Sequence, residues 1–223
     1  MYSEVIYKKI SHFMSTLLTD PHLKRRQIFL SLIKKRVKPG TGSSLIFLNK
    51  RTWNLPVTDI RQLIKDVPFA VVGGVATRLY MPERMTLDLD IIIPADRAQL
   101  AYQNLRDAGA TKVSDLTIPG SQWNLPNGTS LDVLEVDEPW LETALKFPNY
   151  APDGLPIIDL PYLILMKLNA SRSQDLADIS RMVGGATDTQ LEKVRMMVAK
   201  HLPTATEDLE SLIMLGKLEQ QAN

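Results

Sequence analysis

The sequence of 223 residues contains no cysteine. This absence excludes disulfide bonds, a thiol nucleophile, a zinc–thiolate site and an iron–sulfur cluster, because each of them requires thiol groups. Long hydrophobic runs are missing as well, and stretches such as Ile91–Pro94 and Leu160–Met166 are far too short to cross a bilayer. Charged residues interrupt the apolar periodicity near the N-terminus, so we expect no signal peptide. The sequence therefore predicts a cytoplasmic protein without a membrane span.

Motifs that mark several common enzyme classes are also missing. The sequence has no Gly-x-Gly-x-x-Gly, no Walker P-loop and no Gly-x-Ser-x-Gly. His12, His22 and His201 are scattered, and none of them forms a pair with metal-ligand spacing. NAD-dependent and serine-hydrolase chemistry therefore have no support in the sequence.

The composition that remains is typical of a globular protein, with 44% hydrophobic and 23% charged residues. The formal net charge of +1 hides an asymmetry, because residues 1–66 carry 13 Lys/Arg and 4 Asp/Glu (net +9), whereas residues 67–223 carry 13 and 21 (net −8). Such a split indicates that the basic part binds a polyanion or the acidic part of its own fold. Solvated faces of basic surface helices without any partner are the alternative.

Hydrophobic periodicity and turn residues divide the chain into three parts. We expect a basic, mainly helical N-terminal segment over residues 1–66, a small mixed β-sheet core over 67–136 and a helical C-terminal domain over 137–223, which together make an α+β fold. The elements expected in the first part are helices over residues 4–19 and 21–37, a short strand over 45–48 and a helix that Thr58 caps and that ends near Asp66.

Short apolar runs mark the strands of the predicted core. The run Phe69–Val72 ends in Gly73-Gly74, which is typical of a buried strand that turns sharply into a helix over about 75–81. Asn127-Gly128 predicts a two-residue type I′ hairpin turn. The other elements expected are strands over 86–93, 112–118, 121–125 and 129–136, and helices over 94–108, 138–146, 160–170, 174–183, 187–201 and 206–218.

The residues that point to chemistry begin with Asp88 and Asp90. Alternation along a strand places both carboxylates on one face, about 6–7 Å apart at their Cα atoms. Adjacent carboxylates repel one another unless a cation neutralises them, and hard oxygen ligands of this kind suit Mg²⁺. Asp132, on a later predicted strand, supplies a third carboxylate if the two strands are neighbours. Three carboxylates and two Mg²⁺ ions form a clamp for in-line phosphoryl or nucleotidyl displacement.

The segment from Val71 to Ile93, which reads Val-Val-Gly-Gly-Val-Ala-Thr-Arg-Leu-Tyr-Met-Pro-Glu-Arg-Met-Thr-Leu-Asp-Leu-Asp-Ile-Ile-Ile, resembles the signature of the polymerase-β-like nucleotidyltransferase superfamily. Its Gly-Gly-x-Ala…Arg-x-Thr-x-Asp-x-Asp form is similar to the toxin branch of abortive-infection (type IV) toxin–antitoxin systems. The helical segment Leu163–Asp178 is similar to a Lys…Asp-x-x-Asp segment of that branch. Gly74 departs from the pattern, because many members have serine there.

The resemblance implies roles for individual residues. Asp88, Asp90 and Asp132 would hold two Mg²⁺ ions, and Asp132 would also activate the attacking hydroxyl. The residues implied to bind the nucleotide are Gly73, Gly74, Arg84, Lys167 and Asp175, and Lys167 is also counted as catalytic. Asp175 and Asp178, three apart on one helical face, would orient Lys167 or the acceptor. Structural readings stay open beside these: Gly73-Gly74 as a tight turn, Asp132 as a surface acid, Lys167 as an exposed lysine and Asp175 as a helix cap.

The function implied is transfer of a nucleoside monophosphate from an NTP to an acceptor hydroxyl. The basic segment favours an RNA acceptor such as a tRNA 3′ end, and the toxin branch implies a cognate antitoxin. A protein or antibiotic acceptor stays open. A second hypothesis is a catalytically silent nucleotidyltransferase fold that acts as a binding module, although such a module has no need of three mutually repelling carboxylates.

Overall fold

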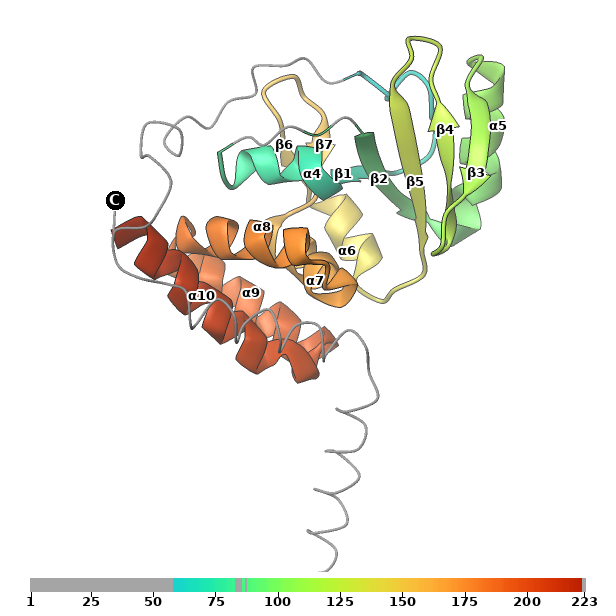
Figure 1. Cartoon of the computed structure of the whole chain (residues 1–223). Coiled ribbons are helices and arrows are strands. Elements are labelled where there is room, and N and C mark those ends of the chain that lie inside the picture. The colour runs from blue at the N-terminus through green and yellow to red at the C-terminus, as the bar shows by residue number, and fades with distance from the viewer. Residues whose placement is uncertain (1–57, 83–85, 87, 222–223) are drawn as a thin grey trace, which may run out of the picture. The chain divides into compact units, whose positions relative to one another are not determined.

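The computed structural model of the chain describes residues 58–82, 86 and 88–221 (Figure 1). The described residues up to Leu163 belong to one compact unit, and those from Ile164 onward belong to another. The helices expected over residues 4–19 and 21–37 and the strand over 45–48 lie outside the described residues. The division of the chain at residues 66 and 136 stays a prediction, because most of the first segment lies outside this range.

The first unit is built on a mixed sheet with the strand order β3-β4-β5-β2-β1-β7-β6 (Figure 1). The central strand β2 pairs in parallel with β5 and antiparallel with β1, and β5 continues antiparallel through β4 to β3. The strands are β1 (Ala70–Val72), β2 (Asp88–Pro94), β3 (Thr111–Asp115), β4 (Gly120–Asn124), β5 (Ser130–Val136), β6 (Asn149–Tyr150) and β7 (Pro156–Ile157). The α+β architecture expected from the sequence is confirmed.

Helical segments connect these strands. The short helix α4 (Gly73–Ala76) and the 3₁₀ turn η1 (Thr77–Leu79) follow β1, whereas the sequence predicted one longer helix there. The other helical segments of this unit are η2 (Ala95–Arg97), α5 (Ala98–Asp107), α6 (Leu141–Lys146) and the start of α7 (Leu160–Ala170).

One face of the sheet is packed against α5. Tyr102 on α5 contacts Trp123 on β4 with ring centroids 5.4 Å apart, and its hydroxyl donates a hydrogen bond to the Glu135 carboxylate on β5. Burial of Trp123 and the neighbouring aliphatic side chains supplies the hydrophobic stabilisation of this layer. Glu135 therefore lies on the α5 side of β5, and Asp132, at odd spacing from it, lies on the other face.

Two local predictions are wrong. The loop between β4 and β5 contains three residues rather than two, because Leu125 and Thr129 pair at its base and Pro126 begins the turn. The fixed negative φ of proline is incompatible with a type I′ turn, so only Gly128 adopts positive φ (+84°). The expected helix after Thr58 is a series of turns, and the Thr58 hydroxyl bonds to the Thr129 hydroxyl at 2.8 Å instead of capping it.

The second unit consists of helices (Figure 1). Besides the larger part of α7, it contains α8 (Ser173–Gly184), α9 (Asp188–His201), the 3₁₀ turn η3 (Pro203–Ala205) and α10 (Thr206–Gln221). A capping box between Thr187 and Gln190 fixes the start of α9. None of the helices in the described part of the chain is long and apolar enough to span a membrane.

Two glycines allow α8 and α10 to pack with their backbones in close contact. A Cβ atom on Gly216 would lie 2.0 Å from the Ser180 carbonyl oxygen and 2.9 Å from Gly184 Cα. Both neighbouring atoms belong to the backbone of α8, so a side chain at Gly216 can be accommodated only by moving one helix away from the other.

We expect Gly216→Ala to lower the free energy of unfolding by about 1–3 kcal/mol, because the cost of overpacking exceeds the gain of about 1 kcal/mol in helix propensity. Chemical denaturation measures the change. The exposed residue Gln220 on the same helix offers a control, since Gln220→Ala should change the value by no more than about 0.5 kcal/mol. A more stable Gly216→Ala protein would contradict the close packing of the two helices.

Candidate functional site

Three carboxylates lie on one face of two adjacent strands. Asp90 on β2 is paired in register with Asp132 on the parallel strand β5, and Asp88 precedes Asp90 by two residues. Side chains of paired residues, and of residues two apart on one strand, point to the same face of a sheet. The structure therefore places Asp88, Asp90 and Asp132 on the same face of the sheet, opposite α5, as the sequence predicted for neighbouring strands.

Asp132 is the most constrained of the three carboxylates. Its Oδ1 atom is buried and has no hydrogen-bond partner. Burial raises the pKa of Asp132, a hydrogen bond from the Gln122 side chain on β4 opposes the shift, and the negative charge of Asp88 raises the pKa further. A buried anionic oxygen without a donor costs free energy unless a proton or a cation neutralises it.

These residues fit a divalent cation. Hard cations such as Mg²⁺ are held by one or two carboxylates, and the donor set here consists of carboxylate oxygens alone. Among the residues that the structure describes, no three acidic or histidine side chains are already gathered as a metal-ligand cluster. The fit therefore rests on the orphaned Asp132 oxygen and on the register of Asp90 with Asp132.

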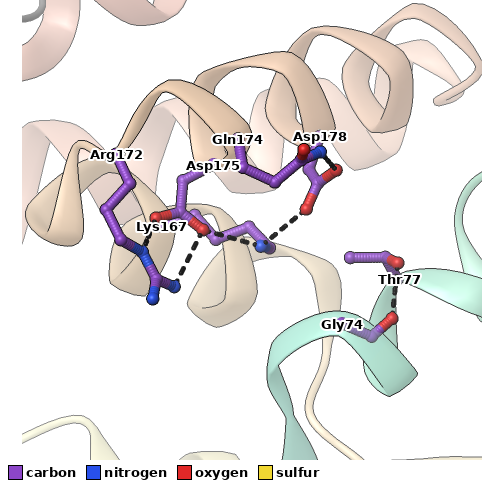
Figure 2. Close-up of polar contacts among 7 residues, drawn as sticks. All are labelled: Gly74, Thr77, Lys167, Arg172, Gln174, Asp175 and Asp178. Carbon is purple, nitrogen blue, oxygen red and sulfur yellow. Dashed lines mark hydrogen bonds and ion pairs between the residues drawn. The ribbon is translucent and has the colours of Figure 1, made fainter. Parts of the chain in front are cut away.

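The turn after β1 lies directly against Asp90. Gly73 has φ +62°, and a Cβ atom there would lie 1.9 Å from Asp90 Oδ2. Only glycine accommodates both this backbone conformation and such a close approach. The Thr77 hydroxyl donates a 2.7 Å hydrogen bond to the Gly74 carbonyl oxygen and thereby closes the short helix α4 (Figure 2).

The charge on Asp132 has a consequence for stability. Because its pKa is raised in the folded protein, the ionised side chain opposes folding once the pH exceeds the ordinary value of 3.8. We expect Asp132→Asn to raise the free energy of unfolding at pH 7 by about 1 kcal/mol, because the amide removes the partly buried charge while it keeps the size of the side chain.

The difference between wild type and Asp132→Asn should disappear as the pH falls below the ordinary carboxyl pKa of 3.8, where both states of the wild type carry a proton. Urea denaturation between pH 3 and pH 8 measures it. Asp137→Asn is a suitable control, since Asp137 is exposed. An Asp132→Asn protein less stable than the wild type at pH 7 would contradict the unfavourable burial of this charge.

The helical unit contains a second, separate group of charges (Figure 2). Lys167 on α7 donates hydrogen bonds to Asp175 Oδ1 and Asp178 Oδ2 on α8, both at 2.9 Å. All three residues are at least 96% buried. Arg172 donates to Asp175 Oδ2 at 2.6 Å, and Gln174 donates to Asp178 Oδ1 at 2.8 Å. The reading of Lys167 as an exposed surface lysine is therefore wrong.

Asp175 was also open to interpretation as a helix cap, and that reading is wrong too. The residue lies inside the first turn of α8, and no side chain caps the helix at Arg172. Burial alone would raise the pKa of Asp175, but the hydrogen bond from Arg172 and the charge of Lys167 hold it below its ordinary value. Lys167 is paired with both Asp175 and Asp178, and the role of these aspartates in orienting Lys167 or the acceptor stays a prediction. The roles of Lys167 and Asp175 toward a nucleotide stay predictions.

One residue predicted for the site lies outside the described residues, and two residues that contact the site were not identified from the sequence. Arg84, expected to bind the nucleotide, lies outside the described residues. Gln122 and Thr77 were not singled out from the sequence, although both contact residues of the site. The pairing of β4 with β5 places Gln122 beside Asp132, and this register depends on the length of the connecting loop.

No model of a known protein family matches the sequence, and no curated protein matches it. Several solved structures resemble the chain with low sequence identities and low TM-scores. The solution structure of the antibiotic-resistance factor ANT(2″)-Ia is 18% identical with a TM-score of 0.37, and the match covers 70% of this chain and 85% of that one. The crystal structure of ANT(2″)-Ia with adenylyl-2″-tobramycin is 16% identical with a TM-score of 0.37, covering 68% and 88%.

The Thermotoga maritima CCA-adding enzyme complexed with tRNA is 15% identical with a TM-score of 0.31, and the match covers 70% of this chain and 47% of that one.

Proposed function

We propose that the protein is a Mg²⁺-dependent nucleotidyltransferase, which moves a nucleoside monophosphate from an NTP to an acceptor hydroxyl and releases pyrophosphate. The observation that carries the proposal is the register of Asp90 with Asp132 on adjacent strands. Gly73 lies against the Asp90 carboxylate, and Asp132 has a buried oxygen without a hydrogen-bond partner. A structural sheet has no need of adjacent carboxylates that repel one another, whereas a metal-binding sheet does.

In this proposal each carboxylate has a defined task. If Mg²⁺ is bound, Asp88 and Asp90 would hold both ions, and Asp132 would hold the ion that activates the acceptor hydroxyl. When bound, Mg²⁺ neutralises charge on the phosphates and lowers the pKa of the acceptor hydroxyl. Alternatively, Asp132 would itself accept the proton of that hydroxyl.

The reaction forms a bond between the acceptor oxygen and the α-phosphorus and breaks the bond between that phosphorus and the oxygen of the β-phosphate. The hydroxyl proton goes to Asp132 or to water, and the electron pair of the broken bond leaves with pyrophosphate. Gly73 presents backbone without a side chain next to Asp90. The backbone amides of Gly73 and Gly74 are proposed to bind the triphosphate, as the sequence resemblance implies. Arg84, Lys167 and Asp175 are proposed to bind the nucleotide as the sequence resemblance implies.

The acceptor is the least constrained part of the proposal. The net charge of +9 over residues 1–66 supports RNA, such as a tRNA 3′ end, because clustered Lys and Arg bind phosphates. The motif from Gly73 to Asp90 supports a toxin role with a cognate antitoxin in the cytoplasm. A protein hydroxyl or an antibiotic is the alternative acceptor.

Incubation with each α-³²P-labelled NTP, Mg²⁺ and either total RNA, a protein extract or tobramycin tests the proposal. We expect label in one acceptor fraction and none when EDTA replaces Mg²⁺. Label in protein or tobramycin would redirect the acceptor but retain the activity. Failure to label any acceptor, together with no Mg²⁺-dependent NTP binding, would instead favour a catalytically silent binding module.

A further inference from the structure

The face of the sheet that carries the three aspartates continues onto β4 with polar, uncharged side chains. Gln122 is paired in register with Asp132, and Asn124 is paired with Ser130, which in turn is paired with Asp88. Gln122, Asn124 and Ser130 therefore lie on the same face as the carboxylates, in two cross-strand rows. We refer to these three residues as the amide–hydroxyl surface.

The amide–hydroxyl surface is accessible and is not used up by internal contacts. Asn124 is exposed, and Gln122 and Ser130 are partly exposed. The Gln122 side chain contacts the Ser130 hydroxyl at 3.5 Å, which is too long for a strong hydrogen bond, and it also reaches Asp132. Within the described range, no hydrogen bond joins the Asn124 side chain to another residue. Donors and acceptors on this surface are thus available to a ligand.

Cationic side chains of this part of the sheet lie on the opposite face. The bulge in β3 between Lys112 and Ser114 brings Lys112 and Asp115 to one face, where they form a salt bridge, and Lys112 also lies over the Tyr102 ring. In the described parts of β2, β3, β4 and β5, no Lys or Arg shares the face of Asp132. Such a surface suits neutral hydrogen-bonding groups rather than a phosphate backbone.

We propose that the amide–hydroxyl surface binds the acceptor, and that the group it recognises is a sugar with neighbouring hydroxyls. This inference rests on the proposed function. In-line displacement requires the attacking and leaving oxygens on opposite sides of the phosphorus. Gly73 lies against Asp90 on the β1 side of the carboxylates, and Gln122 lies beside Asp132 on the β4 side. With the triphosphate on the β1 side, the acceptor hydroxyl reaches Asp132 from β4.

The amide and hydroxyl groups then hold the sugar while Asp132 faces its attacking hydroxyl. The Asn124 amide both donates and accepts hydrogen bonds, so it can bind two adjacent hydroxyls, and the amide oxygen of Gln122 can accept a hydrogen bond from another. The same sugar chemistry has two sources, namely the terminal ribose of an RNA and a free polyhydroxylated compound. A long RNA would place its end on this surface and its phosphates elsewhere.

The test uses the double variant Asn124→Ala/Ser130→Ala of the full chain, with Gln99→Ala on the exposed face of α5 as the matched control. The acceptor probes are total tRNA, the same tRNA after periodate oxidation of its terminal diol, and tobramycin. For the double variant we expect the KM of the acceptor that is labelled to rise about tenfold, and the Kd of Mg²⁺–NTP to stay within about twofold. The control should match the wild type in both.

Label in tRNA that periodate abolishes identifies the RNA end as the source of the sugar, and label in tobramycin identifies a free compound. Three results would overturn the assignment but leave the nucleotide site intact. The first is an unchanged acceptor KM in the double variant, and the second is label in tRNA that survives periodate. The third is a protein that binds Mg²⁺–NTP but labels only protein or no acceptor. A wild-type protein that binds no Mg²⁺–NTP would overturn the proposed function itself.

Discussion

Asp90→Asn is expected to reduce nucleotidyl transfer by a factor of about 10²–10³ or more, the largest effect on activity that the site predicts. Asp90 is paired with Asp132 across β2 and β5, and its carboxylate lies against Gly73. Replacing it by the neutral amide removes one charged ligand from the proposed ions without a change in side-chain volume. The fold should be retained or slightly stabilised, because repulsion among the carboxylates falls.

Initial rates of label transfer, measured together with urea denaturation, separate the loss of activity from a loss of fold. Asp96→Asn is the matched control, since Asp96 follows β2 directly and is exposed. The control should retain the activity of the wild type. Comparable turnover in Asp90→Asn and the wild type would contradict the assignment of Asp90 as a metal ligand, and unfolding of Asp90→Asn would contradict the expected relief of repulsion.

Lys167→Met is expected to lower the free energy of unfolding at pH 7 by about 3–5 kcal/mol. Lys167 Nζ lies 2.9 Å from both Asp175 and Asp178 inside the helical unit. Removing the cation leaves two buried carboxylates. Arg172 still neutralises part of the charge of Asp175, and Gln174 donates a neutral hydrogen bond to Asp178. Loss of one partner of a buried ion pair costs far more than loss of a surface pair.

The loss should depend on pH. The lowered pKa of folded Asp175 contributes stability above the ordinary carboxyl value of 3.8, and this contribution disappears as the pH falls further. The difference between Lys167→Met and the wild type should therefore be largest near neutral pH and shrink below pH 4. Lys193→Met, at an exposed lysine of α9, should change the stability by less than about 1 kcal/mol. Equal stability of the Lys167 and Lys193 variants would exclude the buried network.

The sequence predicted the strands and helices that depend on hydrophobic patterning. The central strand β2 could be found because Asp88 and Asp90 alternate with apolar residues and the isoleucines after them are buried. Helices α7, α8 and α9 were expected within one or two residues of their observed bounds, since glycine and Thr187 mark their ends. The same alternation predicted that Asp88 and Asp90 lie on one face of the strand and that Asp132 lies on a later strand.

Features that depend on tertiary contacts could not be predicted. The sequence could not tell that Thr58 bonds to Thr129, so it suggested a helix cap. The burial of Lys167 follows from the packing of α7 against α8, because a lysine on a helix is usually exposed. Strands β6 and β7 contain only two residues each, too few for a hydrophobic pattern, and they form because β7 pairs with β1.

The most direct test of the proposed site is the binding of Mn²⁺, a paramagnetic substitute for Mg²⁺, in the presence of a non-hydrolysable NTP. Electron paramagnetic resonance counts the bound ions. If Asp88, Asp90 and Asp132 hold the nucleotide's cations, the wild type should bind about two ions per chain and Asp90→Asn fewer. A wild type that binds no Mn²⁺ with the nucleotide, or an Asp90→Asn protein that binds as many ions, would contradict the account.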